Sequence, residues 1–129
     1  MNKEYVTWKQ VDEFVDDVAA SFVADMLLDK PPGVYGLPRG GLVLAVMLSH
    51  KLDIPLLAAP CDGCIIVDDI CDSGESLKHY YDQTSSIHKR GYRIVTMYYN
   101  ITSKVIPSFF RYLKKDSWIV FPWECEHSN

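Results

Sequence analysis

A short, uninterrupted apolar run, Cys-Ile-Ile-Val at residues 64–67, limits the folds that are open to this chain. Polar and apolar residues do not alternate along this run, so a strand made from it needs cover on both faces. Strands of that kind are typical of parallel sheets, whose connecting helices lie against the two sides. Because the run ends at Asp68 and Asp69, the sequence predicts a middle strand with carboxylates at its carboxyl end.

Helix patterns and strand patterns alternate along the rest of the chain. Thr7 and Gln10 have capping-box spacing, apolar residues then recur at helical spacing, and Pro31 and Pro32 end that pattern. Predicted helices cover residues 7–30, 42–52 and 75–88, and predicted strands cover 34–37, 54–59 at an edge, 64–67, 92–99 and 118–121, with 107–115 less regular. The alternation predicts an α/β fold, with a mostly parallel, Rossmann-like sheet flanked by helices and ligands beyond the strands' carboxyl ends.

Length and charge narrow the class of protein. With 129 residues and no repeat or linker, the chain is expected to form one domain over residues 1–129. Its 13 basic and 17 acidic side chains give a net charge of −4, which argues against nucleic-acid or anionic-membrane partners. The longest apolar run, 42–48, is shorter than the ~20 residues of a membrane-spanning helix, and the polar start lacks a signal-peptide core. We therefore expect a cytoplasmic protein.

Four cysteines leave a second class of site to consider. Cys61 and Cys64 form a lone CxxC pair, which could complete a zinc site with Cys125 and His127, or act as a redox pair. Single CxxC pairs are common, and a chain with a sizeable core does not need a disulfide framework. Reduced thiols are the simpler interpretation.

The segment from residue 65 to 76 carries the most chemical information. Adjacent carboxylates that leave an apolar strand need compensation by a divalent cation, by hydroxyl donors or by both. The following residues, Asp-Ser-Gly-Glu-Ser at 72–76, enter a predicted helix, where free backbone amides and two hydroxyl groups can hold one phosphate. Together these features describe a site for a phosphorylated ribose. The alternative is a helix N-cap with solvated acidic neighbours.

This segment resembles the phosphoribosyl-diphosphate (PRPP) motif of the type I phosphoribosyltransferases, which is a hydrophobic strand, two acids, two variable residues and then Asp-Ser/Thr-Gly-x-Ser/Thr. Residues 36–42 resemble the family's pyrophosphate loop. Residues 116–124 and the start at 4–8 are similar to the bacterial xanthine-guanine phosphoribosyltransferases. The resemblance runs nearly end to end and implies the family's fold with a small C-terminal hood over the base.

The resemblance also implies roles for individual residues. Asp68 and Asp69 would bind the ribose hydroxyls directly or through Mg²⁺, and Asp72 would be the catalytic proton acceptor at a ring nitrogen of the base. The remaining implied contacts are the 5′-phosphate with residues 72–76 (Asp72, Ser73, Gly74, Glu75, Ser76), pyrophosphate with Arg39, Gly40 and Gly41, and the base with Trp118, the carbonyl of Ile119, and Asn100.

Three departures from the family pattern stand out. Glu75 replaces a small residue, and Asn100 replaces a lysine expected at the purine 6-oxo group, with Lys104 as a badly spaced substitute. The stretch 54–67 must hold two strands and has no room for the ~12 residues of a mobile lid. The missing lid implies a slow or hydrolysis-prone transferase, a lid from another segment or subunit, or a binding protein without catalysis.

The sequence thus predicts a Mg²⁺-dependent enzyme that transfers the phosphoribosyl group of PRPP to a nucleobase, most simply a 6-oxopurine such as guanine, hypoxanthine or xanthine, and releases pyrophosphate. The alternative is a non-catalytic or regulatory protein of the same fold that binds PRPP or a nucleotide. The family resemblance makes a homodimer or higher homo-oligomer the expected assembly.

Overall fold

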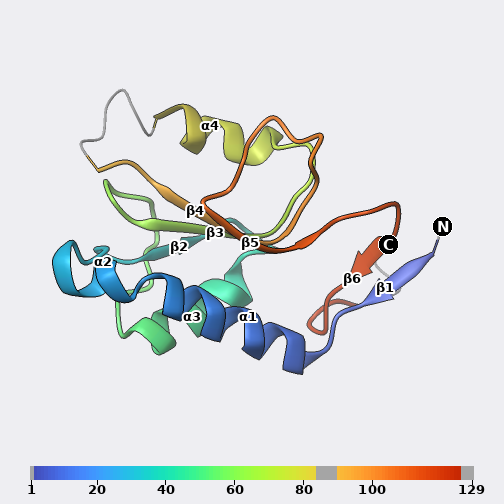
Figure 1. Cartoon of the computed structure of the whole chain (residues 1–129), viewed down its shortest axis with the longest axis horizontal. Coiled ribbons are helices and arrows are strands. Elements are labelled where there is room, and N and C mark those ends of the chain that lie inside the picture. The colour runs from blue at the N-terminus through green and yellow to red at the C-terminus, as the bar shows by residue number, and fades with distance from the viewer. Residues whose placement is uncertain (1, 84–89, 126–129) are drawn as a thin grey trace.

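A computed structural model describes residues 2–83 and 90–125. Strands β2 (Val34–Gly36), β3 (Ile65–Cys71), β4 (Arg93–Tyr99) and β5 (Phe109–Leu113) form a four-stranded sheet in that order, and every pairing in it is parallel. Strands β1 (Lys3–Tyr5) and β6 (Trp118–Val120) form a separate parallel pair. Helices α1 (Trp8–Ser21) and α3 (Leu42–Leu52) cover one face of the larger sheet, and α4 (Glu75–Gln83) covers the other (Figure 1). The predicted α/β fold with a mostly parallel sheet is confirmed.

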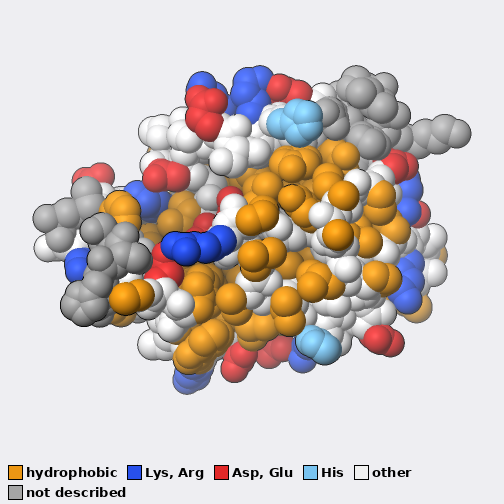
Figure 2. Space-filling model, turned by 180° about the vertical axis from the view of Figure 1, so that it is seen from behind, with side chains coloured by type: hydrophobic (Ala, Val, Ile, Leu, Met, Phe, Trp, Pro, Cys, Tyr) orange, Lys and Arg blue, Asp and Glu red, His pale blue; other side chains and the backbone are white. Residues whose placement is uncertain are grey.

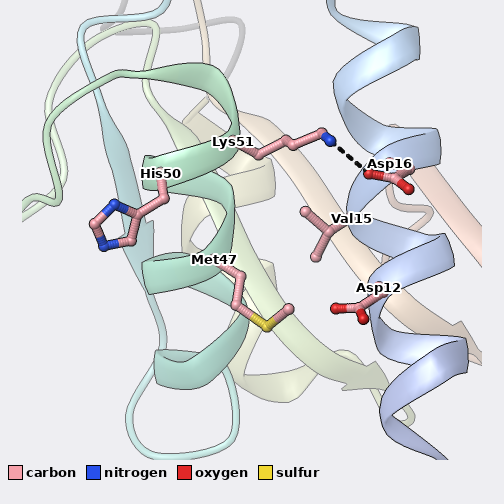
Figure 3. Close-up of a pocket in the computed structure, with 6 residues that line it drawn as sticks. All are labelled: Asp12, Val15, Asp16, Met47, His50 and Lys51. Atoms are coloured by element: carbon pink, nitrogen blue, oxygen red, sulfur yellow. Dashed lines mark ion pairs between the residues drawn. The ribbon is translucent and has the colours of Figure 1, made fainter.

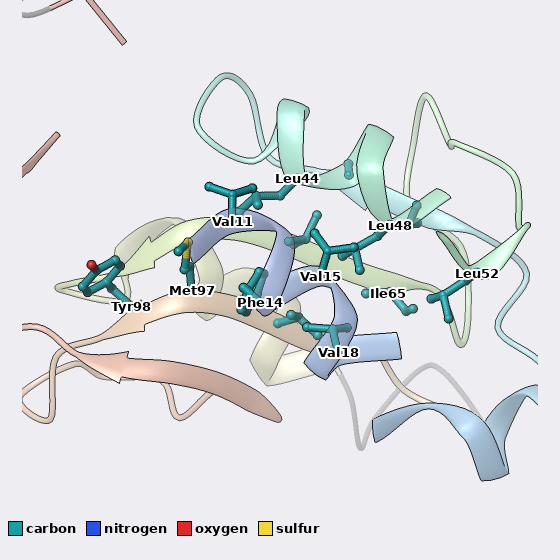
Figure 4. Packing of buried hydrophobic residues seen from close by; sticks show 14 of the residues in the cluster. Val11, Phe14, Val15, Val18, Leu44, Leu48, Leu52, Ile65, Met97 and Tyr98 are labelled. Atoms are coloured by element: carbon teal, nitrogen blue, oxygen red, sulfur yellow. The ribbon is translucent and has the colours of Figure 1, made fainter. Parts of the chain in front are cut away.

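Apolar side chains of α1 and α3 fill the space beneath the sheet. Val11, Phe14, Val15 and Val18 of α1 repeat at helical spacing and are all buried, together with Leu48 of α3 (Figure 4). A smaller cluster lies on the opposite face, between α4 and the sheet. Both faces of β3 are therefore covered, as its uninterrupted apolar sequence requires.

The helix predicted over residues 7–30 is wrong in one respect, because it breaks at Phe22. The capping box forms as expected: the Gln10 amide donates to Thr7 Oγ1 (3.1 Å), and the Thr7 amide donates to Gln10 Oε1 (2.9 Å). Phe22 is buried in the core, and a separate helix, α2 (Val23–Leu28), follows it with no buried residue. The backbone leaves the helical conformation at Phe22 (φ −101°, ψ +9°), and in α2 Met26 still packs partly against the core.

Other predicted boundaries also change. The edge strand expected at 54–59 is reduced to one bridge between Leu56 and Val34. Strand β3 continues through the acid pair to Cys71, and β5 lies within the stretch described as less regular. The predicted helix 75–88 is observed to Gln83, and its last part lies outside the described residues. Within residues 2–83 and 90–125, no helix is both long and apolar enough to cross a membrane.

The buried face of α1 gives a direct test of the fold. We expect Val18→Ala to lower the free energy of unfolding by about 2 kcal/mol, because the side chain is fully buried and its loss leaves a cavity. The matched control is Val23→Ala in α2, where the side chain is 58% exposed and the change should be close to neutral. Urea unfolding measures both, and equal losses would contradict the assignment of the core.

Candidate functional site

The acid pair lies near the carboxyl end of the central strand. Asp68 and Asp69 are within β3, and each accepts a backbone hydrogen bond from the next residue, from Asp69 N to Asp68 Oδ1 (2.9 Å) and from Ile70 N to Asp69 Oδ1 (2.7 Å). Burial raises the pKa of Asp68 to about 8, and repulsion from Asp69 adds to the shift. Burial also raises the pKa of Asp69. Two partly buried carboxylates that resist ionisation are suited to a cation or to hydroxyl donors.

The donor set fits Mg²⁺ held jointly with a substrate. The described residues contain no cluster of three or more His, Cys, Asp or Glu side chains that would enclose a metal by themselves. Mg²⁺ commonly uses only one or two protein carboxylates and takes its other ligands from water and substrate phosphates. Asp68 and Asp69 provide that kind of partial site.

A small pocket of about 120 Å³ follows directly after the acid pair. The turn at Gly74 has a φ of +85°, which favours glycine, and α4 begins at the next residue. Ser73 Oγ accepts from the Glu75 amide (3.3 Å), so the turn leads compactly into the helix N-terminus. All five residues of the predicted phosphate cradle, 72–76, line this pocket. The other lining residues are Asp68, Ile70, Cys71 and Leu77.

The loop after β4 packs against this cradle. A Cβ at Gly74 would lie 2.6 Å from Ser103 Oγ, and the Lys104 amide donates to the Ser73 carbonyl (3.0 Å). The Lys104 ammonium pairs with the exposed Glu75 carboxylate, and this pairing lowers the pKa of Glu75. In this structure Lys104 is therefore engaged by Glu75 at the rim of the cradle.

The loop between β2 and α3 reaches the other side of the acid pair. A Cβ added at Gly40 would overlap the Asp69 carboxylate, so glycine is what permits this close approach. Arg39 and Gly40 line a pocket of about 620 Å³ together with Asp69. Leu42 and Val43 of α3 also line this pocket. The C-terminal segment completes its wall with Trp123, Glu124 and Cys125, which were not predicted to lie here.

Asp72 is contacted by the residues that directly follow β4 and β5. Asn100 Nδ2 donates to Asp72 Oδ1 (2.9 Å), and Lys114 Nζ lies 3.7 Å from Asp72 Oδ2. Lys114 was not predicted, because residues 107–115 have no clear strand pattern. No local sequence pattern marks it, because its place directly after β5, level with the residues that follow β3 and β4, depends on the strand pairing.

Two of the three predicted base-binding residues, Trp118 and Ile119, lie in the second sheet. Trp118 and Ile119 belong to β6, which pairs with β1 through Lys3 and Glu4. Trp118 is 47% exposed and Ile119 is buried. Trp118 thus has an accessible indole, whereas only the backbone of Ile119 is suited to contact a ligand.

The connection between α3 and β3 lines neither of the two pockets beside the acid pair. Leu56 and Ile65 both lie beside Val34, at the amino end of β2. The chain between Leu56 and Ile65 therefore begins and ends beside the amino end of β2, whereas the acid pair lies further along β3. Cys61 in this connection is exposed and Cys64 is buried, and burial raises the pKa of Cys64 to about 11. That environment makes Cys64 a poor thiolate. Of the other two proposed zinc ligands, Cys125 lines the pocket beside Arg39, and His127 lies outside the described residues.

A further groove of about 560 Å³ separates α1 from α3 (Figure 3). Lys51 Nζ bridges it to Asp16 Oδ1 at 2.8 Å. None of the predicted site residues lines this groove, so its size does not make it the candidate site.

Comparison with known proteins agrees with the geometry. No family model matches the chain. A xanthine-guanine phosphoribosyltransferase of Nitratidesulfovibrio vulgaris is 27% identical over 147 positions, covering 94% of this chain and 84% of the relative. A purine phosphoribosyltransferase structure from Pyrococcus horikoshii has a TM-score of 0.79 at 29% identity, covering 96% of this chain and 95% of that one. A xanthine-guanine-hypoxanthine phosphoribosyltransferase from Helicobacter pylori matches at TM-score 0.76 and 17% identity, covering 99% and 97%.

This chain is a phosphoribosyltransferase of the type I fold. The alignment with the N. vulgaris relative extends over 147 positions although this phosphoribosyltransferase has 129 residues, so the alignment contains gaps opposite residues of the relative. The match with the P. horikoshii structure spans nearly all of both chains.

The acid pair gives the phosphoribosyltransferase a characteristic pH dependence. Between the ~3.9 pKa of an unfolded aspartate and the raised pKa of Asp68, the folded state holds a proton that the unfolded state has lost. The contribution of Asp68 to the free energy of unfolding is therefore complete below about pH 4 and is lost as the pH rises toward 8. We expect Asp68→Asn, in metal-free buffer at pH 8, to raise the free energy of unfolding by about 1 kcal/mol or more.

Urea unfolding of both proteins from pH 4 to 8 measures this difference, which should shrink toward pH 4. The control is Asp16→Asn on the exposed side of α1, where no comparable gain is expected. A destabilised Asp68→Asn protein at pH 8 would contradict the assigned burial cost.

Proposed function

We propose that this phosphoribosyltransferase transfers the 5-phosphoribosyl group of PRPP to a 6-oxopurine and releases pyrophosphate, with Mg²⁺ as cofactor. The observation that carries the proposal is the convergence of three parts at the carboxyl edge of one sheet. These parts are the acid pair of β3, the phosphate-sized pocket at residues 72–76, and the loop of Arg39, Gly40 and Gly41, called the glycine loop, whose Gly40 lies against Asp69. The names of the xanthine-guanine and purine phosphoribosyltransferase relatives support the purine assignment.

PRPP would extend across these three parts. The amides and hydroxyls of residues 73–76 would hold the 5′-phosphate at the start of α4. Asp68 and Asp69 would bind the ribose hydroxyls and Mg²⁺, which when bound offsets negative charge on the diphosphate. Arg39 and the amides of Gly40 and Gly41 would hold the diphosphate on the opposite side.

The chain's own residues would then assist the displacement. The lone pair of base N9 forms a bond to ribose C1, and the bond from C1 to oxygen breaks with its electrons on pyrophosphate. The proton on N7 of the attacking tautomer passes to Asp72, which Asn100 holds in place. Arg39 stabilises the charge that develops on pyrophosphate. Trp118 would stack on the base, and the Ile119 carbonyl would accept from it.

The second candidate function is PRPP or nucleotide binding without catalysis. It is favoured by the course of residues 57–64, which return to the amino end of β2 and do not approach the acid pair. A site left open to water stabilises a developing charge less well.

Incubation of the protein with PRPP, Mg²⁺ and a panel of purine and pyrimidine bases separates these functions. We expect nucleotide and pyrophosphate in equal amounts with a 6-oxopurine. Pyrophosphate without nucleotide would indicate hydrolysis, and tight PRPP binding with no turnover on any base would support the binding protein. Omission of Mg²⁺ should abolish turnover.

Variants of the acids test the separate roles. Asp72→Asn should lower kcat by about 100-fold or more and leave PRPP affinity nearly unchanged, because it removes only the proton acceptor. Asp68→Ala and Asp69→Ala should each weaken PRPP binding by roughly 10- to 100-fold. Calorimetric titration and steady-state rates measure these effects, with Asp16→Ala in the α1–α3 groove as the control. Unchanged PRPP affinity in both alanine variants would refute the ribose and Mg²⁺ assignment.

We also propose that the protein is a homo-oligomer. Seen from behind, the molecule has a face on which hydrophobic side chains gather (Figure 2). Exposed apolar residues include Leu42 and Val46 of α3 and Leu56 in the connection to β3. Burial of such residues against a second copy would remove them from water. Light scattering after size-exclusion chromatography should give a mass of at least twice 14.7 kDa, and a monomer would contradict the proposal.

A further inference from the structure

Three residues far apart in the sequence form a row across the carboxyl edge of the sheet. Strands β3, β4 and β5 are aligned so that Cys71 lies opposite Tyr99 and Tyr99 opposite Leu113. The Asn100 amide donates to the Cys71 carbonyl (2.9 Å), and the Lys114 amide donates to the Tyr99 carbonyl (2.8 Å). The residues that directly follow these strands therefore lie side by side. They are Asp72 after β3, Asn100 after β4 and Lys114 after β5.

Asn100 is committed to local hydrogen bonds in this row. Its Oδ1 accepts from both the amide (3.0 Å) and the hydroxyl (2.8 Å) of Thr102, which fixes the orientation of the side-chain amide. Its Nδ2 donates to Asp72 Oδ1. Asn100 is thus engaged in holding the carboxylate of Asp72.

Lys114 has donors to spare. Its side chain is only 17% exposed, and its ammonium lies 3.7 Å from Asp72 Oδ2 and 3.4 Å from the Lys115 carbonyl. Both distances exceed the 2.7–3.2 Å of an ordinary hydrogen bond. An ammonium has three N–H donors, so Lys114 can bind a further acceptor while it stays beside Asp72.

We propose that Lys114, and not residue 100, supplies the cation that recognises the oxo group at C6 of the purine. In a 6-oxopurine, N7 and O6 lie on the same edge of the ring, whereas an adenine ring presents an amino donor beside N7. Asp72 faces N7 and the neighbouring Lys114 ammonium faces O6, so the pair matches that edge. The amino group of adenine meets a donor and is disfavoured. This inference rests on the proposed function and adds the residue that sets base preference.

The test pairs a substitution with a substrate change. Lys114→Met should lower kcat/KM for hypoxanthine by about 10- to 100-fold, because one hydrogen bond from a charged donor is lost. With unsubstituted purine, which lacks the 6-oxo group, the loss should stay below about 3-fold. Lys114→Arg should retain part of the hypoxanthine activity. The matched control is Lys115→Met, whose exposed side chain follows directly in the sequence and should leave both rates unchanged.

The outcomes separate this inference from the proposed function. If the wild-type protein makes nucleotide but Lys114→Met loses equal activity on hypoxanthine and purine, Lys114 acts only by positioning Asp72, and the inference fails alone. If the wild-type protein makes no nucleotide, the proposed function fails, and binding decides the inference. Calorimetry should then show that inosine 5′-monophosphate binds more tightly than adenosine 5′-monophosphate, and that Lys114→Met removes this preference. A preference that persists in the variant would overturn the inference.

Discussion

The four strands of the larger sheet run parallel to one another, and this common direction places the loops of the candidate site. Because β2, β3, β4 and β5 all point the same way, every loop that follows a strand emerges at one edge. The glycine loop, the phosphate cradle and the row of Asp72, Asn100 and Lys114 are consequences of that single arrangement. The helices that return the chain lie on both faces of the sheet (Figure 1). Ile65, Ile66 and Val67, the apolar start of β3, are fully buried between them, as their sequence requires.

The acid pair shows what such a site costs the fold. Continuing β3 through Asp68 and Asp69 places two carboxylates next to each other in a partly buried strand, and burial raises the pKa of both. Asparagine would keep the hydrogen bonds to the following amides without the charge. The sequence keeps the acids instead, as expected where binding of a cation or hydroxyl groups compensates the electrostatic cost.

The segments that flank the candidate site come from later in the chain and not from the connection before β3. Ser103 packs against Gly74 on the phosphate side, and Trp123, Glu124 and Cys125 form part of the wall beside Arg39. These contacts come from the loop after β4 and from the segment after β6. Their position gives the protein partial cover over its candidate site within 129 residues.

Local patterns of apolar residues, glycines and acids were enough to predict the fold class, the α3 boundaries, the capping box of α1 and the order of the site loops. No local pattern predicted the break at Phe22, the loss of the edge strand at Leu56 or the presence of β5. These features depend on which side chains find room in the core and which backbone groups find a partner strand. The same reason hid Lys114, since its place beside Asp72 arises from pairing across three strands and not from any nearby sequence pattern.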